Sequence, residues 1–124
     1  MAYRGTGTVL GDSTTPLFWP LTEWISTTGI QEVRTRVELR SQVAGANIAS
    51  AYQVADSVNS PGSVGAVSSY LASEGEQFDS SYTDLESALQ GKLFVRFGVY
   101  VKKLSGLQPI FAGWSSIDVD VKVK

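Results

Sequence analysis

The stretch GKLFVRFGVYVK, residues 91–102, decides the fold of this 124-residue chain. Its odd positions are all apolar, whereas the even positions between them are aromatic, charged or glycine. An alternation of period two places one set of side chains on a buried face of a β-strand and the other on its outer face. The strand spans roughly 30 Å at about 3.3 Å per residue, enough to cross a small sandwich. The residues expected in the core are Leu93, Val95, Phe97, Val99 and Val101.

The same alternation recurs at residues 33–40, 48–54 and 117–124. Shorter candidates lie at 6–10, 23–27, 67–72 and 78–84, and glycine-containing turns separate the stretches. Strands at this spacing predict an all-β fold, a single-domain antiparallel β-sandwich of jelly-roll type with about eight strands. The further core residues that this pattern predicts are Val37, Leu39, Ile117, Val119 and Val121.

Two segments depart from this pattern. In residues 1–30, Pro16 and Pro20 flank a bulky apolar cluster, and proline disfavours a central strand because it lacks an N–H group. We therefore expect a short extended N-terminal arm and edge segment at 1–30, followed by the β-sandwich core at 31–124. Residues 83–89, TDLESAL, favour a helix of one or two turns, with Thr83 as its cap and Glu86 completing a capping box.

Composition argues against several classes of function. The chain has no cysteine and no histidine, which removes thiolate catalysis, the Ser-His-Asp triad and most transition-metal sites. Its net charge of −2 argues against nucleic-acid binding, and no stretch approaches the length of a membrane span. We predict no enzymatic activity, no catalytic residue, no cofactor and no metal. A hydrolase that uses Asp118 and Asp120 is the weakest alternative, because a solvated outer face explains both residues.

The bulky aromatic and basic side chains are the candidates for a binding surface. Three tryptophans, Trp19, Trp24 and Trp114, fit core volume, a protein interface or a sugar-stacking platform, and the sequence leaves these alternatives open. Arg34, Arg36 and Arg40 share one strand face with Glu38, which fits either cross-strand pairs or a polar contact surface. The candidate partner-interface residues are Tyr3, Arg4, Phe18, Trp19, Trp24, Arg34 and Arg36.

Three segments resemble a known class of proteins. They are VRTRVELRSQVAGANIASAYQVADS at 33–57, FDSSYTDLESALQGKLFVRFGVYVK at 78–102 and SSIDVDVKVK at 115–124. Together they look like the small β-sandwich virion structural proteins of tailed bacteriophages, such as capsid decoration proteins and other accessory head or tail proteins. The most specific piece is GKLFVRFGVYVK.

This resemblance implies a non-enzymatic virion structural protein, most specifically a capsid decoration (cement) protein that binds the outer capsid surface and stabilises it. Its implied partners are the major capsid protein or other virion subunits and copies of itself in a homo-oligomer, with a trimer as one option. It implies a virion location, at the capsid surface, after synthesis in the host cytoplasm. The alternative is a carbohydrate-binding, lectin-like β-sandwich module for host attachment, which would bind a glycan.

Overall fold

The alternating stretches form β-strands in the computed structural model of the chain, which describes residues 2–11, 15, 17–40, 46–57, 61–68, 70, 75–79, 81–103 and 111–123. In chain order the elements are β1 (Ala2–Gly11), β2 (Leu17–Pro20), β3 (Ile25–Ser26), β4 (Ile30–Arg40), β5 (Ala46–Ala55), β6 (Pro61–Ala66), β7 (Gly75–Phe78), β8 (Thr83–Asp84), α1 (Glu86–Leu89), β9 (Phe94–Lys103) and β10 (Phe111–Val123). No helix within these residues is long and apolar enough to cross a membrane.

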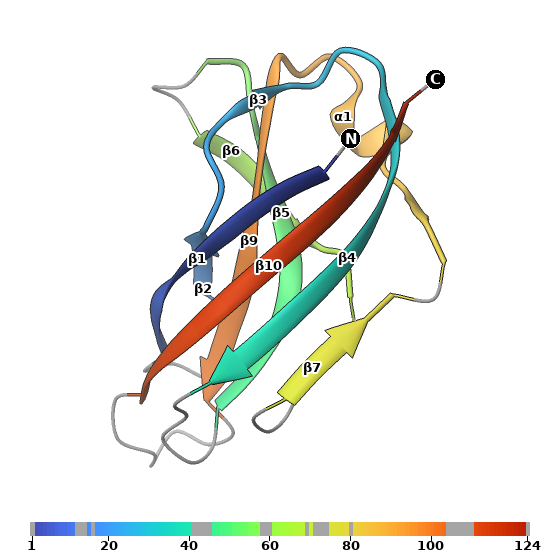
Figure 1. The fold of residues 1–124 in the computed structure, drawn as a ribbon. Helices are drawn as coiled ribbons and strands as arrows, with labels where there is room; N and C mark the ends of the chain where they lie inside the picture. Colours follow the sequence, from blue (N-terminus) through green and yellow to red (C-terminus); the bar gives the residue numbers. More distant parts are fainter. Residues whose placement is uncertain are drawn as a thin grey trace.

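The strands form two antiparallel sheets. Sheet A has the order β1-β10-β4-β7, with β8 also paired to β4, and sheet B has the order β2-β9-β5-β6, with β3 also paired to β9. Figure 1 shows β10 running between β1 and β4, with β9 and β5 behind them. The apolar positions of both sheets face one another across a shared core. The predicted all-β antiparallel sandwich is therefore confirmed.

The pairing is nested along the chain. β1 pairs with β10, β2 and β3 with β9, β4 with β7 and β8, and β5 with β6. A long antiparallel ribbon rolled into two sheets has this order, which is the jelly roll. The described residues form ten strands. β2 and β3 both pair with β9, and β7 and β8 both pair with β4, so each of these two pairs fills one strand position of the sandwich, which leaves eight positions. The jelly-roll type and the approximate number of strands thus agree with the sequence pattern.

The core holds nine of the ten residues that the alternation predicted, including the fully buried Phe97. Leu93 is the exception, because 61% of it is exposed. It precedes β9, which begins at Phe94, so the strand pleat does not determine its direction. Its backbone is nevertheless held, since its N–H donates to the carbonyl of Ala55 and its carbonyl accepts from Thr27.

Local predictions near the turns were less accurate. Of the strand expected at 67–72, residues 67, 68 and 70 are not in a strand, and residues 69, 71 and 72 lie outside the described residues. The strand described nearby is β6 at Pro61–Ala66, an edge strand that tolerates a proline. The short helix is confirmed as α1, but its predicted cap is wrong. Thr83 lies in β8 opposite Val33, and the N–H of Glu86 is accepted by the side chain of Asp84. The N-cap residue is Leu85, which makes no side-chain cap hydrogen bond, so the bond to Asp84 is made one residue before the cap.

The described part of residues 1–30 pairs within the sandwich. β1 pairs with β10 along its whole length, and β2 and β3 both pair with β9, so all three lie at sheet edges. The first edge lies close to the chain that follows β2, because a Cβ atom at Gly5 would lie 1.9 Å from the carbonyl oxygen of Leu21. Residues 12–14 and 16 lie outside the described residues. The division into an arm and a core remains a prediction.

A buried polar link crosses between the two sheets. Thr35 of β4 and Ser50 of β5 point inward, and their hydroxyl oxygens are 2.7 Å apart. The side chain of Asp79 accepts hydrogen bonds from both the hydroxyl and the backbone N–H of Thr35, at 2.7 and 2.9 Å. Ser50 also donates its N–H to the hydroxyl of Ser68. These polar groups are thereby satisfied inside an otherwise apolar core, as buried polar groups usually are.

Candidate interaction surfaces

The outer surface of sheet A, called face A here, carries charges of both signs. They come from the outward positions of β1, β10, β4 and β7, where the alternation turns the remaining side chains away from the core. The charged residues of face A are Arg4, Glu32, Arg34, Arg36, Glu38, Arg40, Glu76, Asp118, Asp120 and Lys122. On these four strands the five basic and five acidic side chains give no net formal charge.

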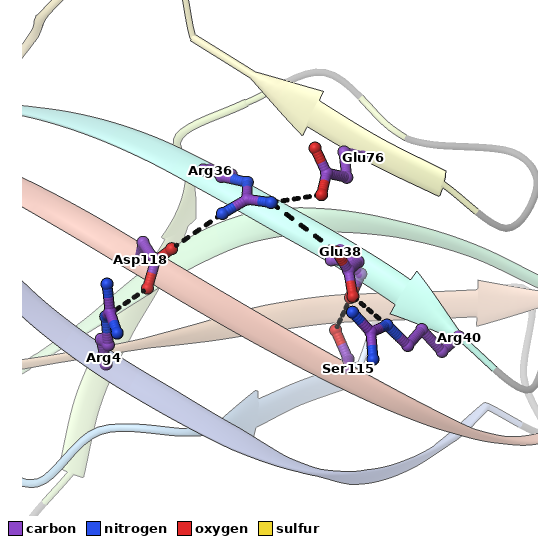
Figure 2. Close-up of polar contacts among 7 residues, drawn as sticks. All are labelled: Arg4, Arg36, Glu38, Arg40, Glu76, Ser115 and Asp118. Atoms are coloured by element: carbon purple, nitrogen blue, oxygen red, sulfur yellow. Dashed lines mark hydrogen bonds and ion pairs between the residues drawn. The ribbon is translucent and has the colours of Figure 1, made fainter.

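One row of face A is a chain of ion pairs across three strands. Arg4, Asp118 and Arg36 are opposite one another in the register of β1, β10 and β4. Nε of Arg4 lies 3.1 Å from one carboxylate oxygen of Asp118, and Nη1 of Arg36 lies 3.4 Å from the other. Figure 2 shows the carboxylate between the two guanidinium groups. Strand register thus brings together residues far apart in the sequence.

A second group continues this row toward the edge of sheet A. Nη2 of Arg36 contacts Glu76 of β7 and lies 3.8 Å from Glu38, whose other oxygen pairs with Arg40 (Figure 2). The Glu38 side chain is only 12% exposed. Its backbone carbonyl accepts a hydrogen bond from the hydroxyl of Ser115, at 2.9 Å. Glu38 is therefore a largely buried carboxylate with two cationic neighbours, which compensates its loss of hydration.

The two aspartates of the alternative hydrolase are both engaged. Asp120 lies 3.1 Å from Nη2 of Arg34, and Asp118 lies between the two guanidinium groups described above. A third pair joins Lys122 to Glu32 at 3.5 Å. Each carboxylate of the pair thus has an arginine beside it. This geometry fits the solvated outer face that the sequence offered as the simpler explanation.

Three arginines of face A also lie over aromatic rings. The contact distances from guanidinium carbon to ring centroid are 4.8 Å for Arg34 over Tyr82, 5.1 Å for Arg36 over Phe78 and 5.1 Å for Arg40 over Trp114. Such distances are typical of cation–π interactions. Phe78 remains 61% exposed despite this contact.

The ion pairs of face A shift several pKa values away from neutral pH. A hydrogen bond to Glu76 is the main cause that raises the pKa of Arg36, and a hydrogen bond to Asp120 does the same for the pKa of Arg34. Conversely, the hydrogen bond from Arg36 lowers the pKa of Glu76. Each partner stabilises the charged form of the other.

Face A is hollowed where β1, β10 and β4 meet the end of β7. The cavity has a volume of about 390 Å³ and is lined by Ala2, Tyr3, Arg4, Arg34, Thr35, Arg36, Phe78, Asp79, Asp118 and Asp120. Its polar side chains are the ion-paired residues of face A together with the Asp79–Thr35 contact. The hollow therefore belongs to the same charge network.

The outer surface of sheet B, called face B here, has a different composition. Its residues include Phe18, Trp24, Ala49, Ala51, Gln53, Tyr70, Arg96, Gly98, Tyr100 and Lys102. Only Arg96 and Lys102 in this set are charged. Within the described part of the chain, neither of these cations has a carboxylate within ion-pair distance, whereas each basic side chain of face A has one.

Arg96 is held in place by two neutral neighbours. Its Nε and Nη2 atoms both donate to the side-chain oxygen of Gln53, the residue opposite it on β5, at 2.9 and 2.6 Å. The guanidinium carbon lies 4.3 Å from the ring centroid of Trp24. Burial lowers the pKa of Arg96, because desolvation disfavours its charge and no carboxylate compensates. The group therefore has a fixed orientation and an unbalanced positive charge.

The other end of face B is aromatic. The rings of Phe18 and Tyr100 pack edge to face with centroids 6.3 Å apart, and Nζ of Lys102 lies 4.1 Å from the ring centroid of Tyr70. Burial is the main cause that raises the pKa of both Tyr70 and Tyr100. Both phenols therefore stay neutral across the physiological range. The Phe18–Tyr100 pair and the Lys102–Tyr70 pair together make this end of face B partly apolar.

Small residues occupy the middle of face B. Ala49 and Ala51 of β5 share the outward register of Gln53 but are fully buried. Opposite Ala51, Gly98 admits the backbone of β2, since a Cβ atom there would lie 2.0 Å from the carbonyl oxygen of Trp19. This is a close approach that only glycine allows.

The seven predicted interface residues do not form one surface. Arg4, Arg34 and Arg36 lie on face A, and Phe18 and Trp24 lie on face B. The remaining two, Tyr3 and Trp19, pack against the core clusters and are partly buried. That these residues contact a partner remains a prediction.

Sequence reasoning placed Arg96 outward but did not single out its partners. Gln53 was missed because its role depends on the register of β5 against β9, which determines that it lies opposite Arg96. Lys102 and Tyr70 were missed as a pair because they are far apart in the sequence. The one available signal was the outward alternation of Arg96, Tyr100 and Lys102 along one strand.

The second cavity of the described part of the chain has no metal-site geometry. This cavity, of about 440 Å³, lies beside α1 and is lined by Thr27, Gly29, Ile30, Asp84, Glu86, Ser87, Leu89 and Gln90. Within the described ranges, no cluster of three or more acidic residues has the geometry of a metal site. Asp84, one of the acidic residues that line this cavity, accepts a hydrogen bond from the backbone N–H of Glu86. That carboxylate has a structural role.

Comparison with known proteins identifies relatives of the fold. No protein-family model matches the chain, and no curated protein sequence matches it. Solved structures do match: a chain of the T13 particle of infectious bursal disease virus has a TM-score of 0.57 at 12% identity, and one of its derived T=1 particles has 0.57 at 13%. The virus's VP2 subviral particle gives 0.56 at 10% identity.

The extent of these matches is asymmetric. Each covers 96% of this chain but only 30–32% of the viral chain, so this chain spans less than a third of the length of the proteins that it matches. At such low identity the likeness establishes a shared fold and nothing finer. The jelly roll described above is therefore one that also occurs within chains of a virus particle.

Proposed function

We propose that this chain is a non-enzymatic structural component of a virus particle. The observation that carries the proposal is the jelly roll itself, because the likeness to chains of virus particles extends over 96% of the sequence. The surfaces support it. The two candidate carboxylates are engaged by arginines, and face A is an ion-pair network without net charge. Such a domain is suited to stable contacts rather than to chemistry.

Within that class, the finer proposal is a decoration protein on the outer surface of a tailed-bacteriophage capsid. It would bind the major capsid protein or other virion subunits, after synthesis in the host cytoplasm. Repetition over a symmetric shell lets weak individual contacts give firm attachment, especially when the protein is a homo-oligomer such as a trimer. The support is the resemblance of GKLFVRFGVYVK and its flanking segments to such proteins.

Glycan binding by a lectin-like module has less support. It requires aromatic rings free to stack on sugars, yet Trp24, Trp114, Tyr70, Tyr82 and Phe78 each have one ring face occupied by an arginine or lysine of this chain. Neither described cavity includes a tryptophan. A glycan array probed with the purified protein would revive this alternative if it gave specific binding that Trp24→Ala removes.

The decisive experiment measures the protein in particles. Particles of the virus that encodes the chain are purified on a density gradient, and quantitative mass spectrometry compares this chain with the major shell protein. We expect a fixed stoichiometric ratio across the particle peak. Absence from the peak, or a ratio that varies between preparations, would contradict a structural role.

A gene deletion then separates decoration from shell building. A decoration protein is dispensable for closure of the shell, so particles that lack it should form and should take up the purified protein at a saturating copy number. If no closed particles form without the chain, it is a shell component and the decoration proposal is wrong. Heating both kinds of particle tests stabilisation, because bound protein should raise the temperature at which the shell opens.

A further inference from the structure

We propose that face B is the docking surface of this protein and that it binds an acidic surface of another protein, with Arg96 and Lys102 as the two cationic contacts. The inference rests on the proposed function for the identity of the partner, which would be another subunit of the particle. That face B recognises carboxylates does not depend on the proposed function.

The argument begins with charge balance. Each basic residue of face A has a carboxylate partner, with the closest nitrogen–oxygen distances at 3.5 Å or less. On face B, Arg96 and Lys102 have no such partner among the described residues, where Arg96 contacts Gln53 and Trp24 and Lys102 contacts Tyr70. The chain as a whole is negative, so this unbalanced positive surface is a local arrangement. A partner with surface carboxylates complements it.

The geometry of Arg96 favours a bound carboxylate. Two of its nitrogens donate to Gln53, and the ring of Trp24 fixes the plane of the guanidinium. Its third nitrogen, Nη1, has no hydrogen-bond acceptor among the described residues. An arginine that is already oriented loses less side-chain entropy when it binds a carboxylate.

The rest of face B has the composition of a protein interface. Aromatic residues and arginine are enriched in the centre of such interfaces, whereas acidic residues are depleted. Face B supplies the edge-to-face pair of Phe18 and Tyr100 and the ring of Trp24. About 20 Å separates Arg96 from Lys102, six residues further along β9, at the usual rise per residue. That span fits a protein surface.

An acidic protein fits face B better than an acidic sugar. Small ligands bind in concave sites, and neither of the two described cavities is lined by a residue of face B. The rings of Trp24 and Tyr70 each hold a cation of this chain, which leaves less surface for stacking on a sugar. Two separated cations beside aromatic rings instead match the rim charges and apolar centre of a protein contact.

The first test compares two double variants in binding to particles that lack the chain. Arg96→Gln with Lys102→Gln removes the cations of face B. Lys92→Gln with Lys122→Gln makes the same change in net charge at lysines that have carboxylate partners. We expect the first variant to bind about tenfold or more weakly at low salt and the second to bind like the original protein. In 0.5 M salt the difference should shrink, because screening weakens exposed charges.

Two outcomes of this experiment overturn the inference. If both variants bind like the original protein, face B is not the docking surface, although the proposed function stands. If the Lys92 and Lys122 variant is the weaker one, the contact lies elsewhere. Circular dichroism and thermal unfolding confirm that each variant is folded, and Lys102→Gln alone provides a second reading if loss of Arg96 disturbs Gln53.

The second test does not depend on particles. The ¹⁵N-labelled protein is titrated with a poly-glutamate peptide, and amide shifts are mapped onto the two sheets. We expect shifts on β9 and β5 that disappear in the Arg96 and Lys102 variant. No shifts, or shifts confined to sheet A, would overturn the inference even if the protein binds particles. Stronger shifts with polysialic acid than with poly-glutamate would assign the face to an acidic glycan and reject the protein partner.

Discussion

Face A and face B are built on the same scaffold but handle charge in opposite ways. On face A, Asp118 lies between two guanidinium groups and Glu38 lies beside Arg36 and Arg40, so positive and negative side chains are paired. On face B, the polar and ring contacts of Arg96 within the described residues are to the neutral Gln53 and to Trp24. Face A pairs its charged side chains within this chain, whereas face B leaves positive charge unbalanced.

The difference teaches that strand register, rather than residue count, decides what a charged face can do. Arg36 and Arg96 occupy equivalent outward positions on long strands, and the sequence alone gives them the same description. Their cross-strand neighbours differ: Arg36 is opposite Asp118, and Arg96 is opposite Gln53. Opposite charges across a pair stabilise the sheet locally. A neutral partner leaves the cation available for an external contact.

The largest effect is expected from a substitution in the core between the two sheets that carry face A and face B. Phe97→Ala removes a fully buried ring between the sheets and should reduce the free energy of unfolding by about 3–5 kcal/mol. Phe78→Ala, at a ring that is 61% exposed on face A, is the matched control and should cost less than about 1 kcal/mol. Urea denaturation measures both. Equal losses would mean that the core between the faces is not where stability resides.

The next effect concerns the polar link between the sheets behind the two faces. Thr35→Val leaves the hydroxyl of Ser50 without its partner, so unfolding should become easier by about 1–3 kcal/mol. Adding Ser50→Ala should recover part of the loss, because it removes the unsatisfied group. Thr6→Val, at an exposed position of β1, serves as the control and should change stability by less than about 0.5 kcal/mol. Strictly additive losses in the double variant would argue against a direct link.

A smaller effect tests whether face A is a network. Asp118→Asn removes the carboxylate shared by Arg4 and Arg36, and we expect the melting temperature to fall by about 3 °C at low salt. Asp56→Asn removes an exposed carboxylate that pairs with Lys92 alone and should have little effect. The difference should fade as salt is added. If the two variants melt alike at low salt, the row of face A is a set of independent, weak pairs.

The smallest effect is a titration that sharpens the contrast in charge balance. The hydrogen bond from Arg36 lowers the pKa of Glu76, so this contact is fully stabilising above the ordinary glutamate pKa and is lost as the pH falls through the lowered value. In Arg36→Gln, NMR titration should find the pKa of Glu76 shifted upward. In Arg96→Gln it should not move, because Arg96 belongs to the other face. An unchanged pKa in Arg36→Gln would show that Glu76 does not depend on this arginine.

Period two was enough to predict the fold class. Where a strand is long, as in β9, β4 and β10, one set of alternating side chains is buried, and the sequence identified it correctly. The prediction was wrong at Leu93, one residue before β9 begins, because alternation no longer decides direction outside the pleat. It also missed β6, since a short edge strand with Pro61 and two glycines carries little apolar signal.

The surfaces were harder to predict than the fold. Outward residues were identified, but their distribution over two faces depends on which strands pair. Phe18 and Trp19 are neighbours in the sequence, yet one lies on face B and the other packs against the core. The pairing of Arg96 with Gln53 joins positions 43 residues apart. The local sequence pattern carries no information on such contacts, because they depend on which strands pair in the folded sheets.

The nested pairing also has a mechanical consequence. Because β1 and β10 are antiparallel neighbours, Ala2 lies opposite Asp120, and the start of one strand is beside the end of the other (Figure 1). Tension applied between these two points opens the ladder one residue pair at a time, beginning beside Arg4. Tension applied between Gly11 and Asp120 instead loads all the pairs together. The domain should therefore yield readily to a peeling force and resist a shearing one, so its strength depends on the direction of pull.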